Sequence, residues 1–88
     1  MEFTLPDKSR VDCLTEEYAV EVDFASKWAE ALGQALYYSI QTGKRPGILL
    51  ILEDDKDKRF LERANSVAQR LGIRMWTASK AELEGLQR

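Results

Sequence analysis

The chain has 88 residues, which is room for one domain and not for two. Its 44% hydrophobic and 32% charged residues are typical of a globular protein, and its net charge of -2 argues against a protein that coats nucleic acid through bulk positive charge. One cysteine and no histidine exclude a disulfide framework, histidine-ligated zinc, and Ser-His-Asp or Cys-His catalysis.

The N-terminal residues lack the apolar core of a signal peptide, and the longest apolar run, residues 48–52, is too short to span a bilayer. We therefore expect no membrane partner and a cytoplasmic location.

The first predicted elements are strands. A short strand at residues 2–5 ends in a turn at Pro6-Asp7. Residues 9–14 and 18–24 are rich in valine and alternate in polarity, which predicts two further strands joined by a tight reversal at residues 15–17. This pair is interpreted as an antiparallel hairpin.

A helix is predicted next, over residues 26–41, with Ser26 as its N-cap and Gly43 at its stop. Residues 48–52 form a continuous apolar strand of the kind that is buried in a parallel sheet.

The remaining elements are a second helix, a strand and a short helix. Asp54 or Asp55 caps the second helix, and Gly72 closes it after apolar positions at helical spacing. These positions are Phe60, Ala64, Val67, Ala68 and Leu71. Residues 73–77 form the strand, and residues 79–82 are a capping box. The order predicts one α/β domain over residues 1–88, in which an antiparallel hairpin is followed by a βαβαβ arrangement in a mixed sheet.

The hairpin opposes two acidic residues. A turn centred between Glu16 and Glu17 sets Asp12 opposite Glu21, with Arg10 and Asp23 on the same face of the sheet. The other face, which we expect to be the core face, carries Val11, Cys13, Val20 and Val22.

Directly opposed residues of such a pair have Cβ atoms about 4.5–5.5 Å apart, so the two carboxylates repel unless a proton, a neighbouring basic group or a divalent cation lies between them. Oxygen ligands of this kind suit Mg²⁺ or Mn²⁺. The alternative is that both carboxylates point into water on an exposed sheet face, beside Arg10.

The first helix adds a polar ridge. Lys27, Gln34 and Tyr38 lie within about 40° of one another around its axis. The opposite arc forms a conventional core stripe of Trp28, Leu32, Ala35, Leu36 and Ile40. The alternative for the ridge is a solvated face on which Lys27 and Glu30 form a weak surface pair.

Taken in order, three stretches carry a family resemblance: Arg10-Val11-Asp12, Ala19-Val20-Glu21-Val22-Asp23 and Gln34-Ala35-Leu36-Tyr37-Tyr38. They resemble the PD-(D/E)XK nuclease superfamily, the restriction-endonuclease-like fold, and in particular its RecB-like branch with a Gln-x-x-x-Tyr motif.

The resemblance implies a nuclease that hydrolyses phosphodiester bonds of nucleic acid, expected to be DNA, with Mg²⁺ or Mn²⁺ as cofactor. Asp12 and Glu21 would bind the metal, and the Val22 carbonyl would add a ligand. Gln34 and Tyr38 would support the substrate or the geometry of the site.

The chain departs from the family at the lysine of the acid-x-lysine triplet, where it has Asp23. We expect Lys27 on the helix to take that role and to assist the water nucleophile. Arg10, Lys44 and Arg45 are the predicted phosphate-contacting rim.

A second departure is the helix that members carry before the hairpin, for which residues 1–8 leave no room. A sheet face or edge is then uncovered, so we expect a homodimer or cover from a partner chain. These departures keep an alternative open, a non-catalytic binding or assembly module with the nuclease fold.

Overall fold

The computed structural model describes residues 3–4 and 10–86. Its strands are β1 (Phe3–Thr4), β2 (Arg10–Val11), β3 (Cys13–Leu14), β4 (Tyr18–Phe24), β5 (Arg45–Leu52) and β6 (Arg74–Ser79). Its helices are α1 (Trp28–Thr42), α2 (Lys58–Leu71) and α3 (Lys80–Leu86), and the 3-10 turns η1 (Ala25–Lys27) and η2 (Asp55–Asp57) precede the first two. None of these helices is long and apolar enough to cross a membrane.

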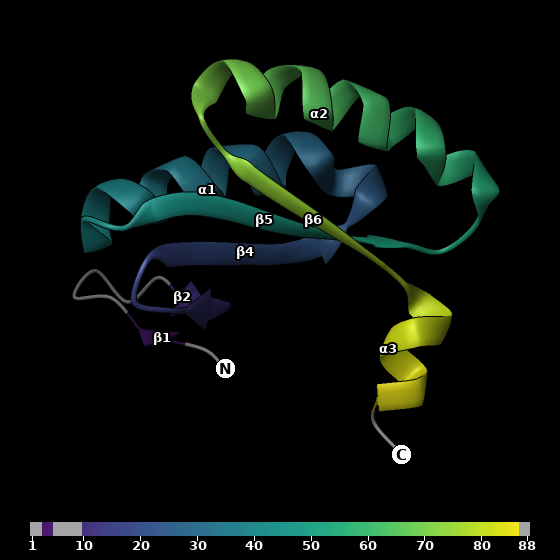
Figure 1. The fold of residues 1–88 in the computed structure, drawn as a ribbon, viewed down its shortest axis with the longest axis horizontal. Helices are drawn as coiled ribbons and strands as arrows, with labels where there is room; N and C mark the ends of the chain where they lie inside the picture. Colours follow the sequence, from purple (N-terminus) through teal and green to yellow (C-terminus); the bar gives the residue numbers. More distant parts are fainter. Residues whose placement is uncertain (1–2, 5–9, 87–88) are drawn as a thin grey trace.

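The main sheet has four strands in the order β3-β4-β5-β6, and helices α1 and α2 lie on it (Figure 1). The β3–β4 pair is antiparallel, whereas β4–β5 and β5–β6 are parallel. The predicted α/β class is therefore confirmed, with an antiparallel hairpin that leads into two parallel crossovers. A separate antiparallel pair joins β1 to β2.

The first strand of the hairpin is interrupted at Asp12. The predicted strand over residues 9–14 divides into β2 and β3, because Asp12 adopts a bend and its side chain receives the backbone N–H of Val22. A side-chain acceptor thus replaces the backbone acceptor that a continuous ladder would provide. Ser9 and the predicted Pro6-Asp7 turn lie outside the described residues.

Helix ends agree with the sequence in four places and differ in one. The predicted capping box ahead of α3 is confirmed, because the Glu82 N–H donates to Ser79 Oγ at 3.0 Å and the Ser79 N–H donates to Glu82 Oε1 at 3.2 Å. Gly43 and Gly72 follow α1 and α2 with φ angles of 70° and 68°, the left-handed conformation expected of C-terminal glycines. Asp54 caps η2 ahead of α2. The Ser26 cap is wrong, because Ser26 lies inside η1 and the α1 N-cap is Lys27, which makes no side-chain cap hydrogen bond.

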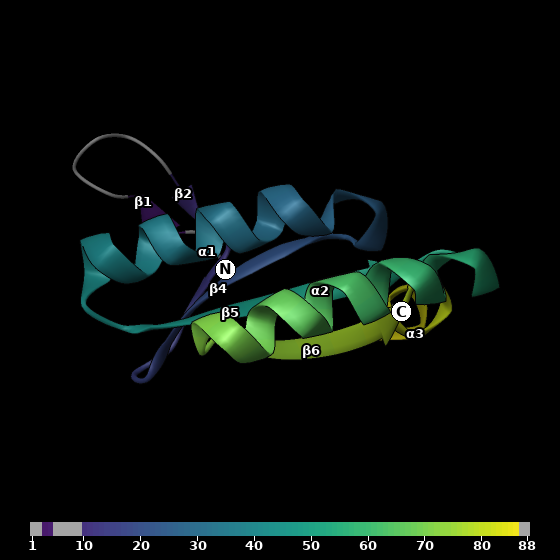
Figure 2. The ribbon, with the colours of Figure 1, turned by 90° about the horizontal axis from the view of Figure 1, so that it is seen from above.

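Both long helices cover the same face of the sheet. They lie side by side over the strands when the molecule is seen from above (Figure 2), and they share one hydrophobic core. The buried members of that core are Ala25, Ala31, Leu32, Ala35, Ile48, Leu50, Ala64, Ala68 and Ile73. Successive parallel strands added in one direction, each through a right-handed crossover, require this placement of the helices.

This placement corrects the predicted core face. Glu21 pairs with Ile48 across the β4–β5 ladder, and paired residues share a face, so the acidic residues of the hairpin lie on the helix-covered side. Cys13, Val20 and Val22 lie on the opposite side; the Val11 side chain lies outside the described part. Alternation identified the two faces but could not show which one the helices cover.

The helices also bury different stripes from those predicted. Ile40 is 77% exposed, whereas Ala31 and Tyr38 of the same helix are buried, so α1 is rotated relative to the predicted stripe. On α2 the buried positions are alanines, and Val67 and Leu71 are 36% and 48% exposed. Alanines at these contacts let both helices approach the sheet closely.

Candidate metal site on the β-hairpin

The hairpin brings Asp12 and Glu21 together. Cys13 pairs with Val20 and Leu14 with Ala19, which is the predicted register, and one row further on Asp12 faces Glu21. The two acidic side chains are hydrogen-bonded to each other. The expectation of an opposed acidic pair is confirmed in this geometry.

Glu21 is buried, with 4% of its surface exposed. Burial raises the pKa of Glu21 to about 9, assisted by the hydrogen bond with Asp12 and by the negative charges of Asp12 and Asp23, while the backbone N–H of Val22 acts in the opposite direction. Glu21 is therefore protonated at neutral pH in the protein without metal, and the alternative of two carboxylates in open water does not hold for it.

The backbone of Val22 faces the same acidic pair. Its N–H donates to Asp12 Oδ2 at 2.9 Å. In a strand, the N–H and C=O of one residue point to the same side, as they do when antiparallel residues exchange both bonds. The Val22 carbonyl consequently faces the Asp12 side of β4, where the acidic side chains meet.

Asp23 and Lys27 lie at the end of β4 and in the turn after it. Asp23 is half-buried, accepts the backbone N–H of Phe24 at 2.8 Å, and raises the pKa of Glu21 through its charge. Lys27 is exposed, and it is not among the groups that shift the pKa of Glu21. Its approach to Glu21 stays a prediction.

Gln34 and Tyr38 differ in environment although they are one helical turn apart. Gln34 is exposed, whereas Tyr38 is 7% exposed and packs with Ala19 and Leu14. Ala19 precedes Glu21 by two residues on the same face of β4, so Tyr38 lies over the hairpin near the acidic pair. The predicted polar ridge of α1 thus has an exposed residue, Gln34, and a buried one, Tyr38.

Two residues of the predicted basic rim, Lys44 and Arg45, lie at the turn end of the hairpin. Lys44 Nζ donates to the backbone carbonyl of Glu16 at 2.8 Å, and Arg45 pairs with the Glu17 carboxylate at 3.0 Å. The Arg45 and Glu17 side chains are 70% and 60% exposed, so Arg45 can exchange this partner for phosphate. The Arg10 side chain lies outside the described part of the chain.

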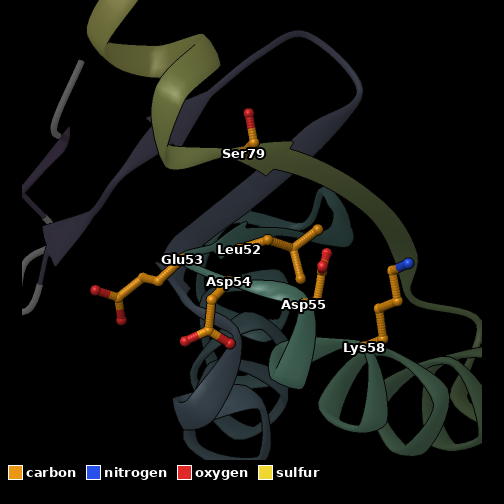
Figure 3. A pocket seen from close by; sticks show the side chains of 6 residues that line it. All are labelled: Leu52, Glu53, Asp54, Asp55, Lys58 and Ser79. Carbon is orange, nitrogen blue, oxygen red and sulfur yellow. The ribbon is translucent and has the colours of Figure 1, made fainter.

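A second acidic group stands at the carboxyl ends of β5 and β6. A pocket of about 250 Å³ there is lined by Leu52, Glu53, Asp54, Asp55, Lys58 and Ser79. Asp55 lies between Leu52 and Lys58, whereas Glu53 extends to the other side (Figure 3). Leu52 is four residues beyond Ile48, the partner of Glu21, so the pocket is about 13 Å from the acidic pair along the strand.

The donor set of the hairpin suits a hard cation that keeps part of its water shell. Asp12, Glu21 and the Val22 carbonyl offer oxygen ligands only, and a bound cation would favour loss of the proton from the buried Glu21 carboxyl and offset the resulting charge. Within residues 3–4 and 10–86, no three His, Cys, Asp or Glu side chains group closely enough to hold a metal by themselves.

Comparison with models of protein families, with curated proteins and with solved structures finds no match to this chain.

Proposed function

We propose that this chain is a metal-dependent nuclease domain of the restriction-endonuclease-like fold, which hydrolyses phosphodiester bonds in nucleic acid. The observation that supports it best is the buried Glu21 carboxyl opposite Asp12, with the Val22 backbone facing both. Burying a carboxyl group against another acid lowers stability, and such an arrangement is more typical of a functional site than of a structural one.

In this proposal Asp12, Glu21 and the Val22 carbonyl hold Mg²⁺ or Mn²⁺. When bound, the ion would lower the pKa of a coordinated water and offset charge on the phosphate. Gln34 at the exposed end of the α1 ridge would contact substrate, and Tyr38 would fix the helix against the hairpin. Lys44 and Arg45 would contact phosphates that flank the scissile one, and DNA is the proposed substrate.

Lys27 is proposed to orient the nucleophile in place of the lysine that Asp23 replaces. Lys27 is exposed at the end of η1, and a lysine side chain is long and flexible enough to turn toward the carboxylates. Its ammonium would also offset the charge of Asp23, which acts on Glu21 in the protein without substrate.

The test is cleavage of plasmid and single-stranded DNA with Mg²⁺ or Mn²⁺. We expect Glu21→Ala and Asp12→Asn to lower the cleavage rate about 100-fold or more, because each removes a metal ligand. Glu62→Ala, which changes an exposed acid on α2, is the matched control and should cleave at the wild-type rate. No cleavage by the wild type, or undiminished cleavage by Glu21→Ala, contradicts the enzymatic proposal.

A second candidate is a non-catalytic binding module of the same fold. It is favoured by one observation, that the charges of Asp12 and Asp23 contribute to the raised pKa of Glu21 and that of Lys27 does not. Binding of Mn²⁺ measured by calorimetry separates the two candidates. Mn²⁺ binding that Glu21→Ala abolishes, with no turnover of DNA or RNA by the wild type, supports the binding module.

A further inference from the structure

The sheet face opposite the helices is apolar. By the register of the ladders, its apolar side chains are those of Val20, Val22, Phe24, Leu49, Ile51, Trp76 and Ala78, and Tyr18, Arg45 and Arg74 lie at its turn end. Val20 is buried and Phe24 is 40% exposed, and the other apolar residues are half-buried. Among the described residues, α1 and α2 both pack on the other face, and α3 projects from the carboxyl end of β6 (Figure 1). We call this surface the open face.

The open face has a shaped centre. Trp76 lies across β5 above Gly47, where an added Cβ would be 2.8 Å from the Trp76 ring, and its ring meets Tyr18 edge-on at 5.3 Å. Beside it is a hollow of about 240 Å³ lined by Cys13, Thr15, Val20, Val22, Leu49 and Trp76. A ridge next to a hollow is a shape that can receive a copy of itself.

We propose that the open face binds the open face of a second copy of this chain, which makes a dimer of two stacked sheets with the helices outside. The two-fold axis runs parallel to the strands and passes over β5. This inference does not depend on the nuclease proposal, because the acidic pair lies on the opposite, helix-covered side of β4.

The area of the open face is sufficient for such a dimer. With strands about 4.8 Å apart and about 3.3 Å per residue, the strands β3, β4, β5 and β6, of 2, 7, 8 and 6 residues, cover on the order of 400 Å². Two rough surfaces of this size bury on the order of 1,000 Å² of accessible surface, which is the amount at which specific interfaces begin. An apolar patch of this size is comparable to the largest on a typical monomer, and such patches are often functional.

The sheet register fits the proposed axis. Leu49 pairs with Val22 on one side and with Trp76 on the other, so these three residues form one row across the sheet. Rotation about an axis parallel to the strands keeps each row at its own level and exchanges β4 with β6. Trp76 of each copy therefore stands over Val22 of the other, beside the hollow.

Charge complementarity supports the same axis. Arg74 is exposed, its guanidinium lies 5.4 Å from the Trp76 ring, and it pairs in the ladder with Gly47, one row toward the hairpin turn. The exchange of β4 with β6 brings it to the turn of the second copy, where Glu17 is paired with Arg45 and the exposed Glu16 is the acid that Arg74 meets. Because the interface is two-fold, this contact between opposite charges occurs twice.

The test is the dimer dissociation constant from sedimentation equilibrium of the full chain. Arg74→Glu and Glu16→Lys each place like charges together, and we expect each to raise the dissociation constant about tenfold or more. The double variant should restore it to within about threefold of wild type. Leu49→Glu, at the centre of the face, should give a monomer, and Arg63→Glu on the outer helix α2 should change nothing.

Circular dichroism confirms that each variant is folded; the exposed Arg74 and Glu16 changes keep the test valid if Leu49→Glu unfolds. A wild-type chain that is monomeric at every concentration overturns the proposal. So does a dimer whose dissociation constant the single charge changes leave unaltered, or the double change fails to restore. Binding of single-stranded DNA to a monomer, lost in Leu49→Glu, would overturn it by assigning the open face to nucleic acid.

Discussion

Burial removes the Glu21 carboxyl group from water, and a buried ionised carboxylate needs a cation or several donors to be tolerated. Among the described residues, the groups that act on its pKa are the acids Asp12 and Asp23 and one backbone N–H, that of Val22. Asp12 accepts the same Val22 N–H at 2.9 Å, so this donor is shared between two acids. The protein without metal consequently keeps a proton on Glu21, at a cost to folding that a bound cation would reduce.

Glu21→Gln should therefore stabilise the metal-free protein at neutral pH, by roughly 1–3 kcal/mol in the free energy of unfolding. The pKa of Glu21 is about 9 in the folded protein against 4.5 for the free group, so between these values the folded state holds a proton that the unfolded state has lost. Wild-type stability should fall as the pH rises from about 4.5 to about 9, and the variant should lack this component.

Urea denaturation in EDTA at several pH values measures both quantities. Glu62→Gln on the exposed surface of α2 is the control and should follow the wild-type pH dependence. Equal pH slopes for the wild type and Glu21→Gln would show that Glu21 is ionised in the folded protein.

At the scale of elements, the hairpin shows what could be predicted from the sequence. Alternation in residues 18–24 fixed the register that the Cys13–Val20 pair displays, because a shift of one residue would exchange the two faces. The bend at Asp12 could not be predicted, since it depends on a side-chain hydrogen bond to Val22 across the ladder. The Ser26 cap failed because a 3-10 turn moved the start of α1 to Trp28.

In strand β5, Gly47 lies against the Trp76 ring, and a substitution at Gly47 tests this contact. An added Cβ there would be 2.8 Å from the Trp76 ring and 3.4 Å from Val20 Cγ2, so Gly47→Ala must displace the ring. We expect a loss of about 1–2 kcal/mol in the free energy of unfolding. Gly33→Ala in α1 is the matched control and should raise the free energy of unfolding. Nothing lies within 4 Å of the added Cβ, and alanine favours the helix by about 0.5–1 kcal/mol relative to glycine.

Thermal or urea denaturation compares the two glycine variants with the wild type. Tryptophan fluorescence in a Trp28→Phe background reports on Trp76 alone, and the displaced ring should emit at longer wavelength. A Gly47→Ala protein as stable as the wild type, with unchanged emission, would show that Trp76 does not lie on Gly47.

At the scale of the whole molecule, the two faces of the sheet differ because of the way in which the chain connects its strands. Two crossovers of the same hand in one direction place α1 and α2 together, so one face holds the large hydrophobic core under the helices and the other has Trp76 and the valines of β4. Hydrophobic content along the chain could not reveal this, because residues of both faces are apolar. It also explains why the predicted core residues Val20 and Val22 lie opposite the helices.

The same architecture predicts how stability is distributed, which hydrogen exchange measures residue by residue. Strand β5 is paired on both sides, and Ile48 and Leu50 are completely buried, so their amides should exchange only through global unfolding. Helix α3 has seven residues and packs mainly on the end of β6, so its amides should exchange about 100-fold faster or more.

Ile48→Val provides the control for this assignment. It removes one buried methyl group and should lower the free energy of unfolding by about 1 kcal/mol. If β4, β5 and α1 open together, the protection of their amides should fall by that same amount, whereas α3, which opens locally, should exchange as before. Protection of α3 equal to that of β5, or a fall confined to β5 alone, would show that the two parallel crossovers do not form one cooperative unit.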